Sequence, residues 1–165
     1  MDSGETSTTS GSDGSFTIKY ANGALISLGG QDVDTLTQLD NFQIIRDLSG
    51  YSSDNFMITP VTSIAHFMPS QNIYNTLGLD SSIDINTADP VANKGDGAGY
   101  DLLYEKGNQL TVLAYSLQNM ANNLKTTTDS TADYFKAISE EISTEHTATS
   151  AAVNIEKKAF IEKVL

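Results

Sequence analysis

The sequence predicts an α+β fold in which a short N-terminal β-ribbon is followed by a predominantly helical bundle. Near the N-terminus, apolar side chains alternate with polar ones, as at Phe16, Ile18 and Tyr20. After Pro60, apolar residues recur every three or four positions instead. This change of period from two to about 3.6 indicates strands first and helices afterwards. A chain of 165 residues is long enough to bury one core, so a single domain is expected.

Three segments make up the predicted organisation. Residues 1–14 are rich in Ser, Thr, Gly and Asp and are expected to form a flexible linker. The strand-rich segment 15–57 and the helical bundle 58–165 are expected to share one domain. The polar start and the uncapped apolar end at Leu165 favour the interpretation that the chain is a fragment of a longer protein.

The predicted ribbon is a hairpin. Residues 15–20 have the alternation of a strand, Asn22-Gly23 is a hairpin-turn signal, and residues 24–28 follow as the second strand. The apolar spacing of residues 36–45 is mixed, so that segment is either a strand or irregular.

The predicted bundle begins at Pro60, because proline is favoured in the first turn of a helix. This helix is expected to end at Pro69, and a short helix over residues 71–77 is expected to stop at Gly78 in a left-handed conformation. An extended acidic loop is predicted for residues 79–90.

Long helices are predicted to complete the bundle. Four leucines seven residues apart indicate an amphipathic helix over residues 99–124, with Leu110, Leu113 and Leu117 in the core. Ser130 and Asp133 have the spacing of a capping box that opens the next helix. A further long helix is expected from residue 150, burying the apolar residues Val153, Phe160 and Val164.

Charge and composition exclude several classes of partner. Twenty-one acidic residues against nine basic ones give a formal net charge of −12, which disfavours nucleic acid and anionic membrane surfaces. No apolar run reaches the roughly 20 residues needed to insert across a membrane. The absence of cysteine excludes a small disulfide-stapled domain.

No motif in the sequence predicts catalysis, so a non-enzymatic protein is expected. His66 and His146 are the only histidines, and no acidic residue lies three or four positions from His66 to orient it as a base. The glycine-rich segment 95–99 lacks the lysine and hydroxyl residue of a phosphate-binding loop. His146 is expected near a helix C-terminus, where it suits the helix dipole.

Calcium is the one cofactor that the sequence suggests. Asp89, Asp96 and Asp101 are the candidate ligands, in a glycine-broken stretch that supplies the oxygen atoms calcium requires. The alternative is that these aspartates only cap helices and start turns. Asp32 and Asp34, after two glycines, are similar to half of a calcium-binding nonapeptide repeat, without a second copy.

Several short strings occur in a fixed order along the chain. They are GSFTIKY, GALISLGGQDVDT, ITPVTSI, LGL and IDINTADPVA, followed by a long Gln- and Asn-bearing helix, and they span about residues 14–125. In this order they resemble a module of very large, repeat-rich bacterial surface adhesins of the RTX-like and cadherin-like exported class. The resemblance implies an extracellular or cell-surface location and carries over no catalytic residues.

The resulting prediction is a non-catalytic structural or adhesion module that acts as spacer, cap or ligand-binding domain. Its expected partners are neighbouring domains of the same chain, or a glycan or other surface ligand. A domain-joining role is favoured over glycan binding, because the strand-rich part has few aromatic residues for sugar stacking and tryptophan is absent. The alternatives are an accessory domain of a secreted enzyme and an intracellular helical scaffold.

Overall fold

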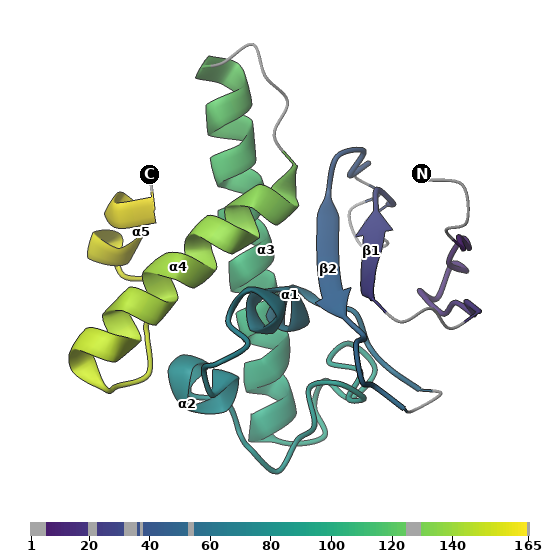
Figure 1. Ribbon diagram of the computed structural model, residues 1–165, viewed down its shortest axis with the longest axis horizontal. Coiled ribbons are helices and arrows are strands. Elements are labelled where there is room, and N and C mark those ends of the chain that lie inside the picture. The colour runs from purple at the N-terminus through teal and green to yellow at the C-terminus, as the bar shows by residue number, and fades with distance from the viewer. Residues whose placement is uncertain are drawn as a thin grey trace.

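The computed structural model describes residues 6–19, 23–31, 36, 38–52, 55–124 and 130–164 (Figure 1). Two strands near the N-terminus precede the helical part, which confirms the α+β prediction. The elements are β1 (Ala24–Leu28), β2 (Gln43–Asp47), α1 (Pro60–Phe67), α2 (Ile73–Leu77), α3 (Ala98–Leu124), α4 (Thr131–Thr149) and α5 (Lys158–Val164).

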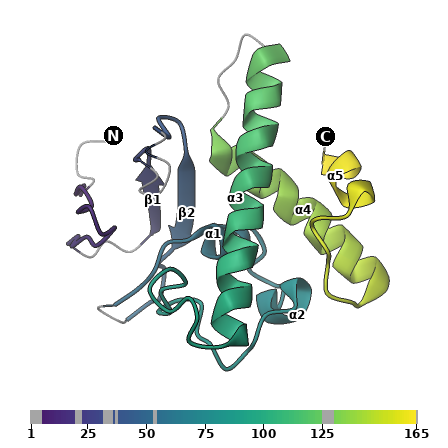
Figure 2. The same ribbon diagram turned by 180° about the vertical axis from the view of Figure 1, so that it is seen from behind.

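The long helix α3 runs through the middle of the molecule. Figures 1 and 2 show α4 crossing α3 at a steep angle, with the two strands on one side of this pair and α5 on the other. Helix α1 contacts β2, α3 and α4, so it joins the sheet to the bundle.

The two strands pair antiparallel, with Ile26 opposite Ile45. The strand predicted at residues 24–28 is therefore confirmed. Its partner is not the predicted strand before the Asn22-Gly23 turn but β2, which lies partly in residues 36–45, where the apolar spacing left strand or irregular structure open. The prediction of a strand at residues 15–20 is wrong for residues 15–19, which belong to no helix or strand. Instead, the Phe16 ring packs edge-on against Phe56, with 5.7 Å between centroids. Tyr20 and Asn22 lie outside the described residues.

Side-chain hydroxyl groups occupy the edge of β2 that faces away from β1. The backbone N–H of Ile45 donates to Ser63 Oγ on α1 at 3.0 Å. The N–H of Gln43 donates to Thr131 Oγ1 at the start of α4, and this hydroxyl donates back to the Gln43 carbonyl at 3.0 Å. Ser63 and Thr131 are fully buried. Two helices thus satisfy backbone groups that a third strand would otherwise bind.

The predicted start of α1 is confirmed. Thr59 is the N-cap, its Oγ1 accepts from the Thr62 N–H at 3.1 Å, and its own N–H donates to Thr62 Oγ1 at 2.8 Å. Pro60 occupies the first turn, where its missing N–H costs nothing. The reciprocal bonds fix the point at which the strand-rich segment becomes helical.

Helix α2 and its cap also follow the prediction. Asn72 Oδ1 accepts from the N–H groups of Tyr74 and Asn75, and Gly78 ends the helix at φ 70°. The segment after Gly78 is a series of turns, so the prediction of an extended backbone over residues 79–90 is wrong.

The capping residues of α4 are those that the sequence indicates. Asp133 Oδ2 accepts from the backbone N–H and the hydroxyl of Ser130, at 3.0 and 2.9 Å. This places a carboxylate in the first turn, where the helix dipole stabilises it.

The prediction of a long helix from residue 150 is wrong, because α5 begins only at Lys158. Ser150 ends α4 in a left-handed conformation, and the Val153 N–H donates to the Thr76 carbonyl at 2.8 Å. That bond holds the intervening segment against α2. Val153 and Phe160 are buried as predicted, whereas Val164 is only half-buried.

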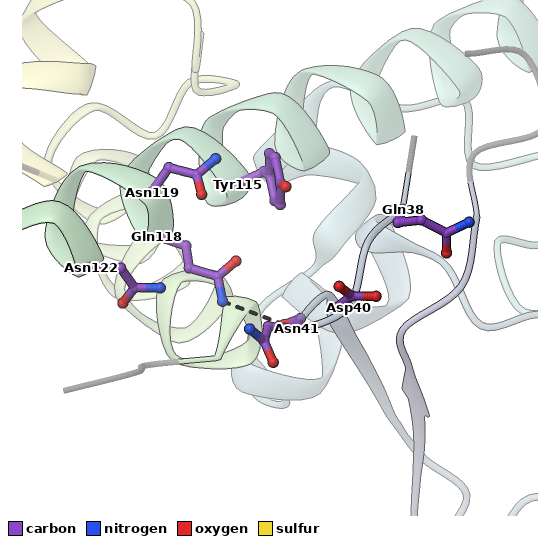
Figure 3. A pocket seen from close by; sticks show the side chains of 7 residues that line it. All are labelled: Gln38, Asp40, Asn41, Tyr115, Gln118, Asn119 and Asn122. Carbon is purple, nitrogen blue, oxygen red and sulfur yellow. Dashed lines mark hydrogen bonds between the residues drawn. The ribbon is translucent and has the colours of Figure 1, made fainter. Parts of the chain in front are cut away.

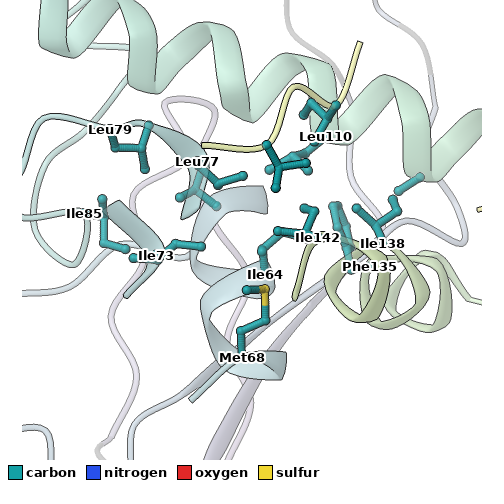
Figure 4. Packing of buried hydrophobic residues seen from close by; sticks show 14 of the residues in the cluster. Ile64, Met68, Ile73, Leu77, Leu79, Ile85, Leu110, Phe135, Ile138 and Ile142 are labelled. Carbon is teal, nitrogen blue, oxygen red and sulfur yellow. The ribbon is translucent and has the colours of Figure 1, made fainter. Parts of the chain in front are cut away.

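Each of the five described helices contributes side chains to a shared hydrophobic core, of which Figure 4 shows residues from α1 to α4. Its most deeply buried members include Ile64, Leu77, Leu110, Phe135, Ile138, Ile142 and Phe160. Leu110 and Leu117 are core residues as predicted, but Leu113 is only partly buried and packs against the cluster.

Candidate functional site

A polar pocket lies between α3 and the segment that leads into β2 (Figure 3). Its volume is about 150 Å³. We name it the amide pocket, because five of its lining residues carry carboxamides. The lining consists of Gln38, Asp40, Asn41, Tyr115, Gln118, Asn119 and Asn122.

One face of α3 forms the helical wall of the amide pocket. Tyr115, Gln118, Asn119 and Asn122 are spaced at i, i+3, i+4 and i+7, which places them side by side on a helix. Gln118 is only 2% exposed, although it is polar. Its Nε2 donates to the backbone carbonyl of Asn41 at 3.4 Å, so it links the two walls.

Backbone hydrogen bonds shape the opposite wall. The Leu39 N–H donates to the Gly30 carbonyl at 2.9 Å, and the Phe42 N–H donates to the Leu39 carbonyl at 3.0 Å. The second bond closes a tight turn immediately before β2, and the first ties the start of this turn to the segment that follows β1. The turn presents Asp40 and Asn41 toward α3 (Figure 3).

The chemistry of the amide pocket suits binding. Each carboxamide offers two N–H donors and an acceptor oxygen, and it does not exchange a proton near neutral pH. Among the residues that the structure describes, the lining also has one carboxylate, Asp40, and one phenol, Tyr115, but no histidine, lysine, serine or threonine. Such a lining can orient a polar ligand by hydrogen bonds.

A second pocket, also of about 150 Å³, lies beside the end of β2. Its lining includes Arg46, the only arginine of the chain, which is 3% exposed. The guanidinium donates to the carbonyls of Met57 and Asn86 and lies 4.5 Å from the centre of the Tyr51 ring. Its contacts bind three segments of the chain together, which makes Arg46 a structural residue.

His66 lines the second pocket together with Asp47 and Thr62. Its Nδ1 is buried and has no hydrogen-bond partner within the part of the chain that the structure describes. A histidine, an aspartate and a hydroxyl in one pocket invite comparison with a catalytic triad. The Thr62 hydroxyl, however, donates to the Thr59 carbonyl at 2.9 Å and accepts from the Thr59 N–H at 2.8 Å. Both of these bonds belong to the N-terminal cap of α1. The hydroxyl is therefore engaged by the Thr59 backbone and is not positioned as a nucleophile.

Asp47 has its own local partners. The hydroxyl of Ser49 is the main cause that lowers the pKa of Asp47, the Ser49 backbone N–H adds to it, and attraction to His66 contributes least.

His146 lies in the last turn of α4, as predicted, with its Nδ1 2.7 Å from the Ala151 carbonyl. The contact with Ala151 explains the position of His146, whereas nothing among the described residues pairs with the buried Nδ1 of His66.

Each of the three candidate calcium ligands has a partner close by in the sequence. Asp89 Oδ1 accepts from the N–H groups of Val91 and Ala92, at 2.9 and 3.0 Å. Asp96 Oδ2 accepts from the Asn93 side chain at 3.1 Å. Asp101, in the first turn of α3, accepts from the Gly95 N–H at 2.8 Å.

The described residues contain no group of three acidic, histidine or cysteine side chains placed to hold a metal ion together. Asp89, Asp96 and Asp101 do not converge as such a group, so calcium at this loop would need further oxygens from backbone or amide groups. The calcium hypothesis stays a prediction. Asp32 and Asp34 lie outside the described residues.

The sequence contained a signal for the amide pocket that its motifs did not single out. The polar residues of α3 at positions 115, 118, 119 and 122 repeat at helical spacing, on a face beside the leucine stripe. What the sequence does not give is the turn at Asp40 and Asn41, about 75 residues earlier, that closes the pocket.

Among the described helices, none has the length and apolar character required to cross a lipid bilayer. Comparison of the chain with protein-family models, with curated proteins and with solved structures gave no significant match.

Proposed function

We propose that this chain is a non-catalytic structural or adhesion module of a large exported bacterial surface protein. The observation that carries the proposal is the lining of the amide pocket, in which five of the seven described residues carry carboxamides. Carboxamides donate and accept hydrogen bonds without exchanging protons near neutral pH, which supports a role in binding or in joining domains.

The use of the aspartates supports a structural role. Asp80, Asp84 and Asp89 each accept the backbone N–H of the residue two positions later, at 2.9 Å in all three cases. These bonds build successive turns between α2 and α3. The acidic side chains therefore stabilise the turns of the long segment that connects α2 to α3.

The surface composition supports an exported setting. The net charge of −12 and the low content of basic residues keep a chain soluble and repel nucleic acid. The resemblance of residues 14–125 to modules of repeat-rich adhesins adds the expectation of neighbouring domains on the same chain.

Antibodies against the purified chain test the proposed location. They should label intact, unpermeabilised cells of the bacterium that makes the protein, and labelling should be lost when surface proteins are removed by protease. Labelling only after permeabilisation would contradict the proposal and favour an intracellular scaffold.

Turnover assays test the non-catalytic part. The purified chain should leave panels of glycans, peptides and esters unchanged on prolonged incubation. Hydrolysis that copurifies with the chain would overturn the proposal. Activity of the whole parent protein, without activity of this chain, would favour an accessory domain of a secreted enzyme.

A further inference from the structure

The amide pocket has the size of a single six-membered ring. A cavity of about 150 Å³ can hold a molecule such as benzene, and the volume of the amide pocket is about 150 Å³. Drug-sized ligands need roughly 300–1,000 Å³. The pocket therefore suits one ring of a larger molecule, with the remainder in solvent.

The lining specifies the chemical class of that ring. Carboxamides of Asn41, Asn119 and Asn122 present donors and acceptors next to one another. Neighbouring hydroxyl groups of a sugar have the matching property, because each hydroxyl both donates and accepts. A purely apolar ring offers neither a donor nor an acceptor to the exposed Asn41 and Asn119 amides, so it would displace their water without replacing its hydrogen bonds.

The negative charge of the pocket and of the chain restricts the chemical class of the ligand further. Among the described lining residues Asp40 alone is charged, and the whole chain carries a net charge of −12. Both disfavour an anionic ligand such as a uronic acid or a sugar phosphate. A neutral sugar meets no such repulsion.

Tyr115 supplies an aromatic surface within the same pocket. It is half-buried on the wall formed by α3, and its ring lies beside the carboxamides in Figure 3. The face of an aromatic ring carries partial negative charge, which attracts the polarised C–H groups of a sugar ring. Aromatic and amide side chains together can therefore contact both the C–H face and the hydroxyl edge of a pyranose.

We propose that the amide pocket binds one neutral pyranose unit of a glycan, with Asn119 and Tyr115 as direct contacts. The pocket is organised for this before any ligand binds, since the buried Gln118 side chain ties α3 to the turn at Asn41. Organisation of this kind lowers the entropic cost of binding. The inference rests on the proposed adhesion function, for which it names the ligand class.

A nuclear magnetic resonance titration of the ¹⁵N-labelled chain tests the proposal. The probes are D-galactose, D-glucose, N-acetyl-D-glucosamine and, as the anionic comparison, D-glucuronate. At least one neutral sugar should cause saturable shifts at millimolar concentration, confined to amides of residues 38–43 and 115–122. D-glucuronate should bind more weakly than that sugar.

Variants on α3 locate the contact. Asn119→Ala should weaken binding about tenfold, as expected for the loss of one hydrogen bond. Asn108→Ala, an exposed asparagine of the same helix outside the pocket, should leave affinity unchanged. Tyr115→Phe should retain binding and Tyr115→Ala should lose it, with the spectrum showing that each variant is folded.

Three results would overturn the proposal: no saturable shift with any neutral sugar, equal binding by Asn119→Ala and the parent, or tighter binding of glucuronate. None of them bears on surface labelling or turnover, so a failure here is distinguishable from a failure of the proposed function.

Discussion

The guanidinium of Arg46 holds Asn86 at two points. One terminal nitrogen donates to the Asn86 backbone carbonyl at 3.0 Å, and the other donates to its side-chain Oδ1 at 3.1 Å. Asn86 in turn donates its backbone N–H and its Nδ2 to Asp84 Oδ1, both at 2.9 Å. β2 is thereby connected to the acidic turns that follow α2.

Replacement of Arg46 should destabilise the fold strongly. Arg46→Ala leaves the Met57 carbonyl and both Asn86 oxygens without their charged donor, so the free energy of unfolding should fall by about 3–5 kcal/mol. Arg46→Lys should cost about 1–3 kcal/mol, because one ammonium cannot reproduce the planar pair of donors. Urea denaturation measures both values.

Lys158→Ala is the matched control for Arg46, since its side chain is 88% exposed and its ion pair with Glu162 is on the surface. It should change stability by less than about 0.5 kcal/mol. Equal effects of Arg46→Ala and Lys158→Ala would show that the Arg46 contacts contribute little.

Thr131→Val should also be costly, although it preserves size. The change removes the hydroxyl that both accepts from and donates to Gln43, and it leaves two partly buried backbone groups without this partner. A loss of about 1–3 kcal/mol is expected in thermal or urea unfolding. Thr144→Val, at an exposed position of the same helix, should have a much smaller effect. Similar losses at both positions would contradict the role of Thr131 at the sheet edge.

Three positions on α3 should differ in their sensitivity to truncation. Leu110 is fully buried, so Leu110→Ala should cost roughly 2–5 kcal/mol. Leu113→Ala should cost less, because Leu113 is only partly buried. Val112→Ala should be nearly neutral, since Val112 is 66% exposed. A different rank order in the measured unfolding free energies would mean that α3 presents another face to the core.

Stability should depend on pH through Asp84. The backbone N–H of Asn86 is the largest cause that holds the pKa of Asp84 below its ordinary value of 3.8. A lowered folded-state pKa stabilises the protein fully above the unfolded value, and this stabilisation is lost as pH falls through the folded value. The stability difference between the parent and Asp84→Asn should therefore be largest near neutral pH and shrink in acid. A difference that is constant with pH would refute this linkage.

The calcium hypothesis for Asp89, Asp96 and Asp101 predicts a change in melting temperature. An ion bound only by the folded chain raises Tm by mass action, so millimolar calcium should raise Tm more than sodium chloride of equal ionic strength. Asp96→Asn and Asp101→Asn should reduce this rise, whereas Asp40→Asn, in another part of the molecule, should not. The absence of a calcium-specific rise would leave these aspartates with their turn-forming roles alone.

The helices that the sequence predicted correctly have local signals at their ends. Thr59-Pro60, Gly78 and the Ser130–Asp133 pair act within a few residues, so they can be identified without knowledge of the tertiary structure. The leucine spacing of α3 is equally local, and it indicated the buried side of the helix.

The errors occurred where distant contacts determine the local structure. The alternation at residues 15–20 suits a strand, yet Phe16 packs on Phe56 instead. The apolar spacing from residue 150 suits a helix, yet the bond from Val153 to Thr76 holds that segment in another conformation. The amide pocket was missed for the same reason, since its two walls come from separate parts of the chain.

The hydroxyl-bonded edge of β2 has a consequence for the order in which the protein forms. Ser63 lies 18 residues after its partner on the strand, and Thr131 lies 88 residues after Gln43. On a ribosome, β2 leaves the exit tunnel long before α4 has been synthesised, so the Gln43 N–H must remain bonded to water during that interval. Contacts of such long sequence separation form late and slow the overall reaction. The strands are thus synthesised early, but the hydrogen bonds along the outer edge of β2 form late. A nascent chain that stops before Thr131 lacks the hydroxyl group that pairs with Gln43.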